Sequence, residues 1–207
     1  MKSGPCETRS QRPSTSIMTL AQDIAACAVC AADLPLGPRP VVRAGDPRAR
    51  ILIIGQAPGI KVKTSGVPWN DASGERLRNW LGVTPKQFYD ESKFAIVPMG
   101  FCYPGRGKSG DKPPRSECAP LWHDRVMQTL PDVRLTLLIG AYAQARYLGE
   151  GRRATLSETV SACHDYIADG FLPVVHPSPR NGIWLRKNPW FETEIVPHLR
   201  TEVARWI

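Results

Sequence analysis

A short apolar run, Ile51–Ile54, ends abruptly at the sequence Gly-Gln-Ala-Pro-Gly of residues 55–59. All four residues of the run are apolar, which is typical of a strand buried on both faces of a parallel sheet. Two glycines and a proline then force a tight turn, and the bare backbone of such a turn lets a ligand approach its N–H groups. Because ligands of open α/β sheets bind beyond the carboxyl ends of strands, this turn is the first candidate for a binding site.

The rest of the chain alternates between similar runs and helical patterns. Ser73 is the expected cap of a helix that carries Leu77, Trp80 and Leu81 on one face. Further strands are expected at Phe94–Met99, Leu135–Ile139 and Leu172–Val175, and helices around Leu20 and Ile24 and at residues 116–130, 141–148 and 190–206. This order predicts an α/β fold, with a central four-stranded parallel sheet flanked by helices.

Composition limits the class of protein. A chain of 207 residues is long enough for one domain, expected at residues 18–207 after a disordered tail at 1–17 rich in Ser, Thr, Pro and Arg. Lys and Arg number 27 against 19 Asp and Glu, and this excess favours a polyanionic partner. No apolar run approaches the roughly 20 residues of a membrane span, and no signal peptide pattern is present, so a cytoplasmic protein is expected. Its cysteines are then better thiols or metal ligands than disulfide partners.

A second strand-end loop, His-Pro-Ser-Pro at residues 176–179, follows the fourth expected strand. Together with the loop at 55–59, in this order, it resembles the two active-site motifs of the uracil-DNA glycosylase superfamily. The resemblance covers about residues 20–206 and implies a three-layer sandwich around the four-stranded sheet. It implies a monofunctional DNA glycosylase that hydrolyses the N-glycosidic bond of uracil or related damaged bases and so initiates base excision repair. The implied partner is damaged DNA, single- or double-stranded, and we expect a monomer.

Four cysteines extend the resemblance. Cys27 and Cys30 are separated by two residues, and Cys102 and Cys118 by fifteen. This spacing resembles that of the iron–sulfur members, families four and five, and implies a [4Fe–4S] cluster held by four thiolates. A tetrahedral zinc site would use the same ligands, and four buried thiols without a metal are a third interpretation. Cys6 and Cys163 match nothing in the pattern.

The reaction needs an anion stabiliser, because negative charge develops on the departing base. In the family, the histidine of the second motif hydrogen-bonds a carbonyl oxygen of that base, which makes His176 the candidate. A structural histidine is the alternative. Backbone N–H groups around Gln56 and Ala57 are expected to assist. We also assign substrate binding to Gly59, Asn70, Ser178 and Arg180.

Two residues between the motifs complete the expected site. Trp69 stands where the family has an aromatic residue that stacks on the base, and a core tryptophan is the alternative. Asp71 lies in a segment similar to that of family five, in which an Asp assists catalysis, although one residue is missing between the aromatic residue and the Asp. Its alternative role is to cap a helix. Either role is compatible with the sequence.

The sequence departs from the family at two positions. Some members carry a carboxylate at the position of Ala57, and pyrimidine-reading members usually carry Asn at the position of Pro98. The backbone of Met99 and Gly100, or the side chain of Asn70, would then have to read the base. A broader range of deaminated or alkylated bases is therefore expected.

Basic residues lie in the loop after the second strand, where contacts to DNA phosphates are expected: Arg106, Lys108, Lys112 and Arg115. A second group follows the second motif, in a loop that in relatives enters the DNA near the flipped base: Arg180, Asn181, Arg186 and Lys187. For each single charge, a solvated surface position is the alternative. A competing interpretation is a damaged-DNA binding iron–sulfur protein with little or no turnover. A third interpretation is a relative that bonds covalently to the abasic product. It would need a nucleophile such as Lys61 or Lys63, and the histidine that such relatives use is missing here.

Overall fold

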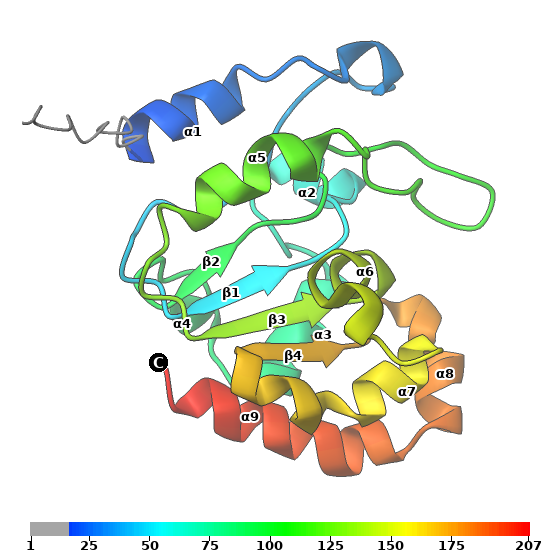
Figure 1. The fold of residues 1–207 in the computed structure, drawn as a ribbon. Coiled ribbons are helices and arrows are strands. Elements are labelled where there is room, and N and C mark those ends of the chain that lie inside the picture. The colour runs from blue at the N-terminus through cyan, green and yellow to red at the C-terminus, as the bar shows by residue number, and fades with distance from the viewer. Residues whose placement is uncertain (1–16) are drawn as a thin grey trace, which may run out of the picture.

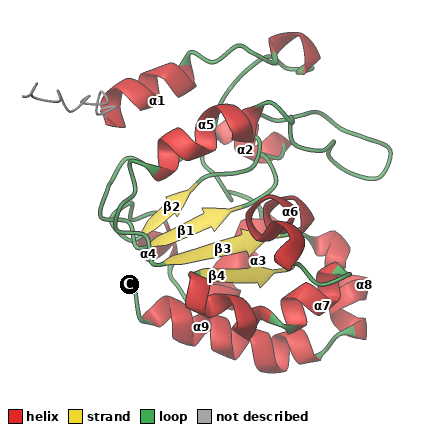
Figure 2. Cartoon of the chain, viewed as in Figure 1, coloured by secondary structure: helices red, strands yellow, loops and turns green. Residues whose placement is uncertain are grey.

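The computed structural model describes residues 17–207, which form a four-stranded sheet between layers of helices (Figure 1, Figure 2). All strands are parallel, in the order β2-β1-β3-β4. The strands are β1 (Ile51–Ile54), β2 (Phe94–Ile96), β3 (Leu135–Ile139) and β4 (Phe171–Val174). The predicted α/β fold with a central four-stranded parallel sheet is confirmed.

The length of each strand depends on the segment that runs beside it. β1 and β3 have their predicted bounds, whereas β2 ends three residues early, at Ile96. The Val97 N–H still donates to Ile53 O in β1, but β1 ends at Ile54, so the Met99 and Gly100 N–H groups bond to the loop at Gly55 and Gln56 instead of to a strand. β4 begins and ends one residue early, because its pairing with β3 starts at Phe171 and stops at Val174.

Helices fill both sides of the sheet. The last predicted helix is divided into a π-helical segment, η5 (Phe191–Ile195), and the helix α9. A 3₁₀ segment, η3 (Cys163–Asp169), precedes β4. The α-helices are α1 (Ile17–Ala25), α2 (Ile60–Ser65), α3 (Ala72–Leu81), α4 (Pro85–Phe88), α5 (Cys118–Met127), α6 (Ala141–Leu148), α7 (Leu156–Ser161), α8 (Gly182–Lys187) and α9 (Val196–Ala204).

Alternate residues of each strand divide the core into two clusters. Ile51 and Ile53 pack with side chains of α3 and α9 on one face of the sheet. Leu52 and Ile54 pack with side chains of α1 and α5 on the other. Figure 1 shows α1 and α5 on one side of the sheet and α9 on the other. The carboxyl ends of all four strands therefore meet at one edge of a rigid sandwich.

The expected tail lies outside the described residues, except for Ile17, which begins α1. Cys6 also lies outside them. Within residues 17–207, no helix is long and apolar enough to cross a membrane.

Candidate active site

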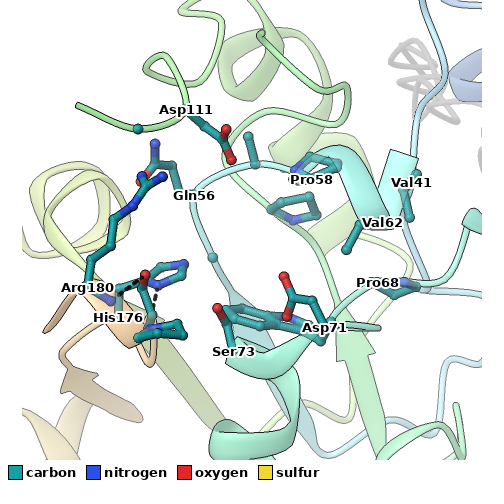
Figure 3. Close-up of a pocket in the computed structure, with 18 of the residues that line it drawn as sticks. Val41, Gln56, Pro58, Val62, Pro68, Asp71, Ser73, Asp111, His176 and Arg180 are labelled. Carbon is teal, nitrogen blue, oxygen red and sulfur yellow. Dashed lines mark hydrogen bonds between the residues drawn. The ribbon is translucent and has the colours of Figure 1, made fainter. Parts of the chain in front are cut away.

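A cavity of about 580 Å³ opens at the carboxyl ends of the strands (Figure 3). Of the nine residues predicted to act in catalysis or substrate binding, eight line it: Gln56, Ala57, Gly59, Trp69, Asp71, His176, Ser178 and Arg180. Asn70 is exposed and is not among the lining residues. The two predicted motif loops thus lie on one cavity, although more than one hundred residues separate them in the sequence.

The backbone around Trp69 is held in an unusual conformation. Its φ of 57° is the only positive value outside glycine in residues 17–207. Two contacts fix it: Arg78 donates to the Trp69 carbonyl at 3.2 Å, and an added Cβ at Gly74 would lie 1.7 Å from that carbonyl oxygen. The indole ring packs on Gly55, where a Cβ would lie 2.8 Å from Cζ2. These two glycines are therefore required to bring the ring to the cavity.

Asp71 caps a helix and also lines the cavity, two placements between which the sequence could not distinguish. It is the N-cap of α3, because Oδ1 accepts a hydrogen bond from the Gly74 N–H at 2.9 Å. The expected cap at Ser73 is wrong: Ser73 lies inside the helix, where its buried side chain lines the cavity. In residues 17–207 the second oxygen of Asp71, Oδ2, has no hydrogen-bond partner, so one oxygen of this carboxylate stays available to the cavity.

His176 follows β4 and faces the same cavity. Its ring lies 5.5 Å from that of Trp69, centroid to centroid. Nδ1 accepts a hydrogen bond from the Ser178 N–H at 3.2 Å, so the proton of the neutral imidazole lies on Nε2. Burial lowers the pKa of His176, while the Asp71 carboxylate acts in the opposite direction. His176 is therefore a neutral imidazole near pH 7 and can donate from Nε2.

The loop that carries His176 is held from both sides. Asn181 Nδ2 donates to the His176 carbonyl at 2.7 Å. Arg76, from α3, donates to the carbonyls of Pro177 and Ser178 at 3.4 and 3.2 Å. Since α3 also carries the cap at Asp71, one helix positions both ionisable residues.

The basic loop at residues 103–114 contacts both motif loops. Gln56 Nε2 donates to the Lys112 carbonyl at 3.3 Å, and Arg180 Nη1 donates to the Ser109 carbonyl at 3.3 Å. Figure 3 shows Gln56, Arg180 and Asp111 along one side of the cavity, across from Asp71. The loop thus forms part of the cavity wall, through Ser109, Gly110 and Asp111.

Pro98 also lines the cavity. The backbone expected to replace the missing Asn is already paired: the Met99 N–H donates to Gly55 O at 2.8 Å, and the Gly100 N–H to Gln56 O at 3.0 Å. The expected reading of the base by the backbone of Met99 and Gly100 therefore cannot use their N–H groups. By contrast, in the described chain the N–H groups of Gln56 and Ala57 have no hydrogen-bond acceptor.

Sequence reasoning missed three polar residues of the cavity, Ser73, Ser109 and Asp111. The sequence pattern around Ser73 indicates only a helix cap. Asp111 lies in the middle of a basic loop, and no local pattern distinguishes it. An added Cβ on Gly59 would lie 3.5 Å from the Asp111 carboxylate, so this acid approaches the first motif.

The four predicted cysteine ligands line a second, small cavity. Cys27 and Cys30 follow α1, Cys102 lies in the loop after β2, and Cys118 is the first residue of α5. Burial is the main cause that raises the pKa of Cys118 to about 12, and it also raises the pKa of Cys30 and of Cys102. Neighbouring thiolates raise these three values further, so Cys30, Cys102 and Cys118 would ionise together only around a cation.

Two features fit this cavity to an anionic metal–thiolate cluster. The Phe101 N–H donates to Cys118 Sγ at 3.2 Å, and such bonds are typical of cluster sulfurs. Arg115 lines the cavity, and its Nε is buried without a hydrogen-bond partner in residues 17–207. A buried guanidinium N–H needs an acceptor, and a negatively charged cluster would supply one.

Comparison with protein families gives a match that covers most of the sandwich. Residues 42–200 match the model described as the uracil DNA glycosylase superfamily.

Proposed function

Because the chain belongs to the uracil DNA glycosylase superfamily, we propose that it is a monofunctional DNA glycosylase for uracil or related damaged bases. The observation that supports this most is the convergence of Trp69, Asp71 and His176 on one cavity. Trp69 and Asp71 come from the loop between α2 and α3, and His176 comes from the loop after β4; together they offer a stacking surface, a carboxylate and a neutral donor. Each of these three groups can assist cleavage of an N-glycosidic bond.

His176 stabilises the leaving base. Its Nε2–H donates to a carbonyl oxygen of the base, and the interaction strengthens as negative charge develops there. A neutral imidazole is suited to this role, because it polarises the oxygen without transferring its proton. The unpaired N–H groups of Gln56 and Ala57 add two donors from the first motif.

Asp71 places the water and offsets positive charge on the sugar. Oδ1 is held by Gly74, which fixes the carboxylate, and Oδ2 orients the attacking water. The water attacks the anomeric carbon as the bond to the base nitrogen breaks, and the electron pair leaves with the base. The proton that the water loses passes by way of Asp71 to the departed base anion. The products are an abasic sugar and a free base, so no covalent intermediate with the protein forms.

The preferred base carries a carbonyl oxygen but is not read by a side-chain amide at position 98. Pro98 offers none, and Met99 and Gly100 have no free N–H. Recognition then depends on stacking with Trp69 and on donors from His176 and the first motif. This favours a group of deaminated bases over uracil alone.

The four cysteines bind a [4Fe–4S] cluster in this proposal. The cluster contributes structure, since it joins the segment after α1 to the loop after β2 and to α5. A zinc ion at the same ligands is the alternative that iron analysis excludes.

The DNA partner binds across the cavity mouth. The target base is flipped out of the stack or taken from a single strand. The loop that borders the cavity contacts DNA phosphates through Arg106, Lys108 and Lys112. The net charge of +8 favours the encounter with DNA. We expect the protein to act as a monomer.

The test is a panel of oligonucleotides, each with one deaminated or alkylated base. Single-turnover cleavage is read as abasic sites, and binding is measured separately. We expect cleavage of at least one carbonyl-bearing lesion and its loss in His176→Ala. Specific binding to damaged DNA without cleavage of any lesion would refute the glycosylase and favour the binding protein.

A further inference from the structure

Outside the catalytic cavity and the cysteine cavity, three potential metal ligands meet at one point. Cys163 and His164 are the first residues of η3, and His198 lies in α9. One ligand atom from each lies within 4.8 Å of the other two. The imidazole rings of the two histidines are 3.9 Å apart, centroid to centroid. None of the three lines either cavity.

His198 provides a second, independent observation. Its Nε2 is buried and has no hydrogen-bond partner in residues 17–207. Its Nδ1 faces the buried carboxylate of Glu202, with 4.0 Å between Nδ1 and Oε1. A carboxylate near Nδ1 favours the tautomer with the proton on Nδ1. The lone pair of Nε2 then has no hydrogen-bond donor in residues 17–207. This arrangement is typical of metal-binding histidines.

The surrounding charges are compatible with a cation. Burial and the neighbouring His164 lower the pKa of His198, so the ring is a neutral ligand. Arg205 is the nearby cation, and its Nη1 is paired with Glu202 at 2.9 Å. Asp165, next to His164, is paired with Arg153 at 2.6 Å. The carboxylates of both pairs offset the neighbouring positive charge.

Cys163 packs in the core cluster on one face of the sheet, and no sequence motif includes it. It is fully buried, and burial raises its pKa to about 11, so without a cation the thiol is protonated and is a poor nucleophile. A coordinated metal ion removes that proton to solvent and forms a metal–sulfur bond. One sulfur and two imidazole nitrogens are a donor set that zinc accepts, with an exchangeable water as fourth ligand.

We propose that Cys163, His164 and His198 bind a zinc ion that joins η3 to α9. Zinc bonds of the usual lengths set the ligand atoms roughly 3.5 Å apart, so small rotations of the side chains close the present group onto an ion. Since η3 packs on β4, the ion ties the C-terminal helix to the strand that leads to His176. The role is structural and does not depend on catalysis.

The test is metal analysis of the full-length protein after it is equilibrated with zinc and dialysed. His164→Gln is the first variant, because His164 is exposed and its replacement leaves the core intact. The control is Asp169→Asn, which removes an exposed side chain at the other end of η3. We expect one more zinc per chain in wild type and control than in His164→Gln, with equal iron content in all three.

X-ray absorption at the zinc edge identifies the ligands without interference from iron. We expect one sulfur and the rest nitrogen or oxygen. Glu202→Gln should weaken zinc binding about 10- to 100-fold, because it removes the carboxylate behind His198. Equal zinc content in wild type and His164→Gln would overturn the proposal. A zinc shell of four sulfurs would also overturn the proposal, because it would assign the zinc to the four-cysteine site. Uptake of copper but not of zinc would overturn it as well.

Discussion

Asp71 is the sharpest test of the proposed chemistry, because its capping and catalytic roles can be separated by two substitutions. Asp71→Asn keeps an oxygen that can accept from the Gly74 N–H, and Asn is as good an N-cap as Asp. Asp71→Ala removes that acceptor, which typically costs about 1 kcal/mol of folding free energy. Both substitutions remove the anion.

The two roles predict different results. If Asp71 only caps α3, Asp71→Asn cleaves like wild type, and Asp71→Ala is only less stable. If Oδ2 places the water, both variants lose at least about 100-fold in rate, or roughly 2.7 kcal/mol of transition-state stabilisation. The rate loss should be similar in the two variants, while only Asp71→Ala lowers the melting temperature appreciably.

The assay is single-turnover cleavage of the best lesion, with DNA affinity and thermal unfolding measured alongside. Glu75→Gln is the matched control, because it removes an exposed carboxylate from the same first turn of α3. A change in the protonation of His176 cannot cause the same rate loss. The Asp71 carboxylate raises the pKa of His176, so removing this carboxylate lowers that pKa and keeps the imidazole neutral. Wild-type cleavage by Asp71→Asn would refute the catalytic role.

Four further predictions concern His176, the cysteine cavity and the basic loop. His176→Ala should lower the single-turnover rate about 100- to 1,000-fold with nearly unchanged DNA binding, and an unaltered rate would contradict its role as a donor. Because burial lowers the pKa of His176, wild-type cleavage should persist as the pH falls below the usual histidine range of about 6.5 and decline only at lower pH; a decline centred above 6.5 would contradict the neutral donor. Purified protein should be brown and contain about four iron and four sulfide per chain, and Cys102→Ala should lose both together with solubility; zinc without iron would contradict the cluster. The double variant Arg106→Ala and Lys108→Ala should weaken binding to all DNA sequences alike and reduce its salt dependence by up to about two phosphate contacts, and an unchanged salt slope would remove this loop from the interface.

The sequence by itself determined the strands and their loops, because both depend on neighbouring residues. Ile51–Ile54 is apolar throughout and therefore forms a strand buried on both faces, and the glycines that follow force the turn. The order of apolar runs and helical patterns was enough to predict the parallel sheet. Because parallel strands bring their carboxyl ends to one edge, the meeting of residues 55–59 with His176 was also predictable.

Contacts between distant segments were decided only by the tertiary structure. Whether Asp71 or Ser73 caps α3 depends on the backbone of Trp69, which Gly74 and Arg78 hold in its left-handed conformation. The pairing of the Met99 and Gly100 amides depends on how closely that segment runs beside the loop after β1. No local pattern contains this spacing.

The limit of local sequence patterns is clearest for the group formed by Cys163, His164 and His198. Cys163 matches no motif and appeared incidental, and His198 lies 35 residues further along the chain. Their approach depends on η3 and α9 packing on the same layer of the sandwich. Local residue patterns encode strands, turns and caps, whereas the positions of ligands from distant segments are fixed only when the apolar faces of those segments share a core.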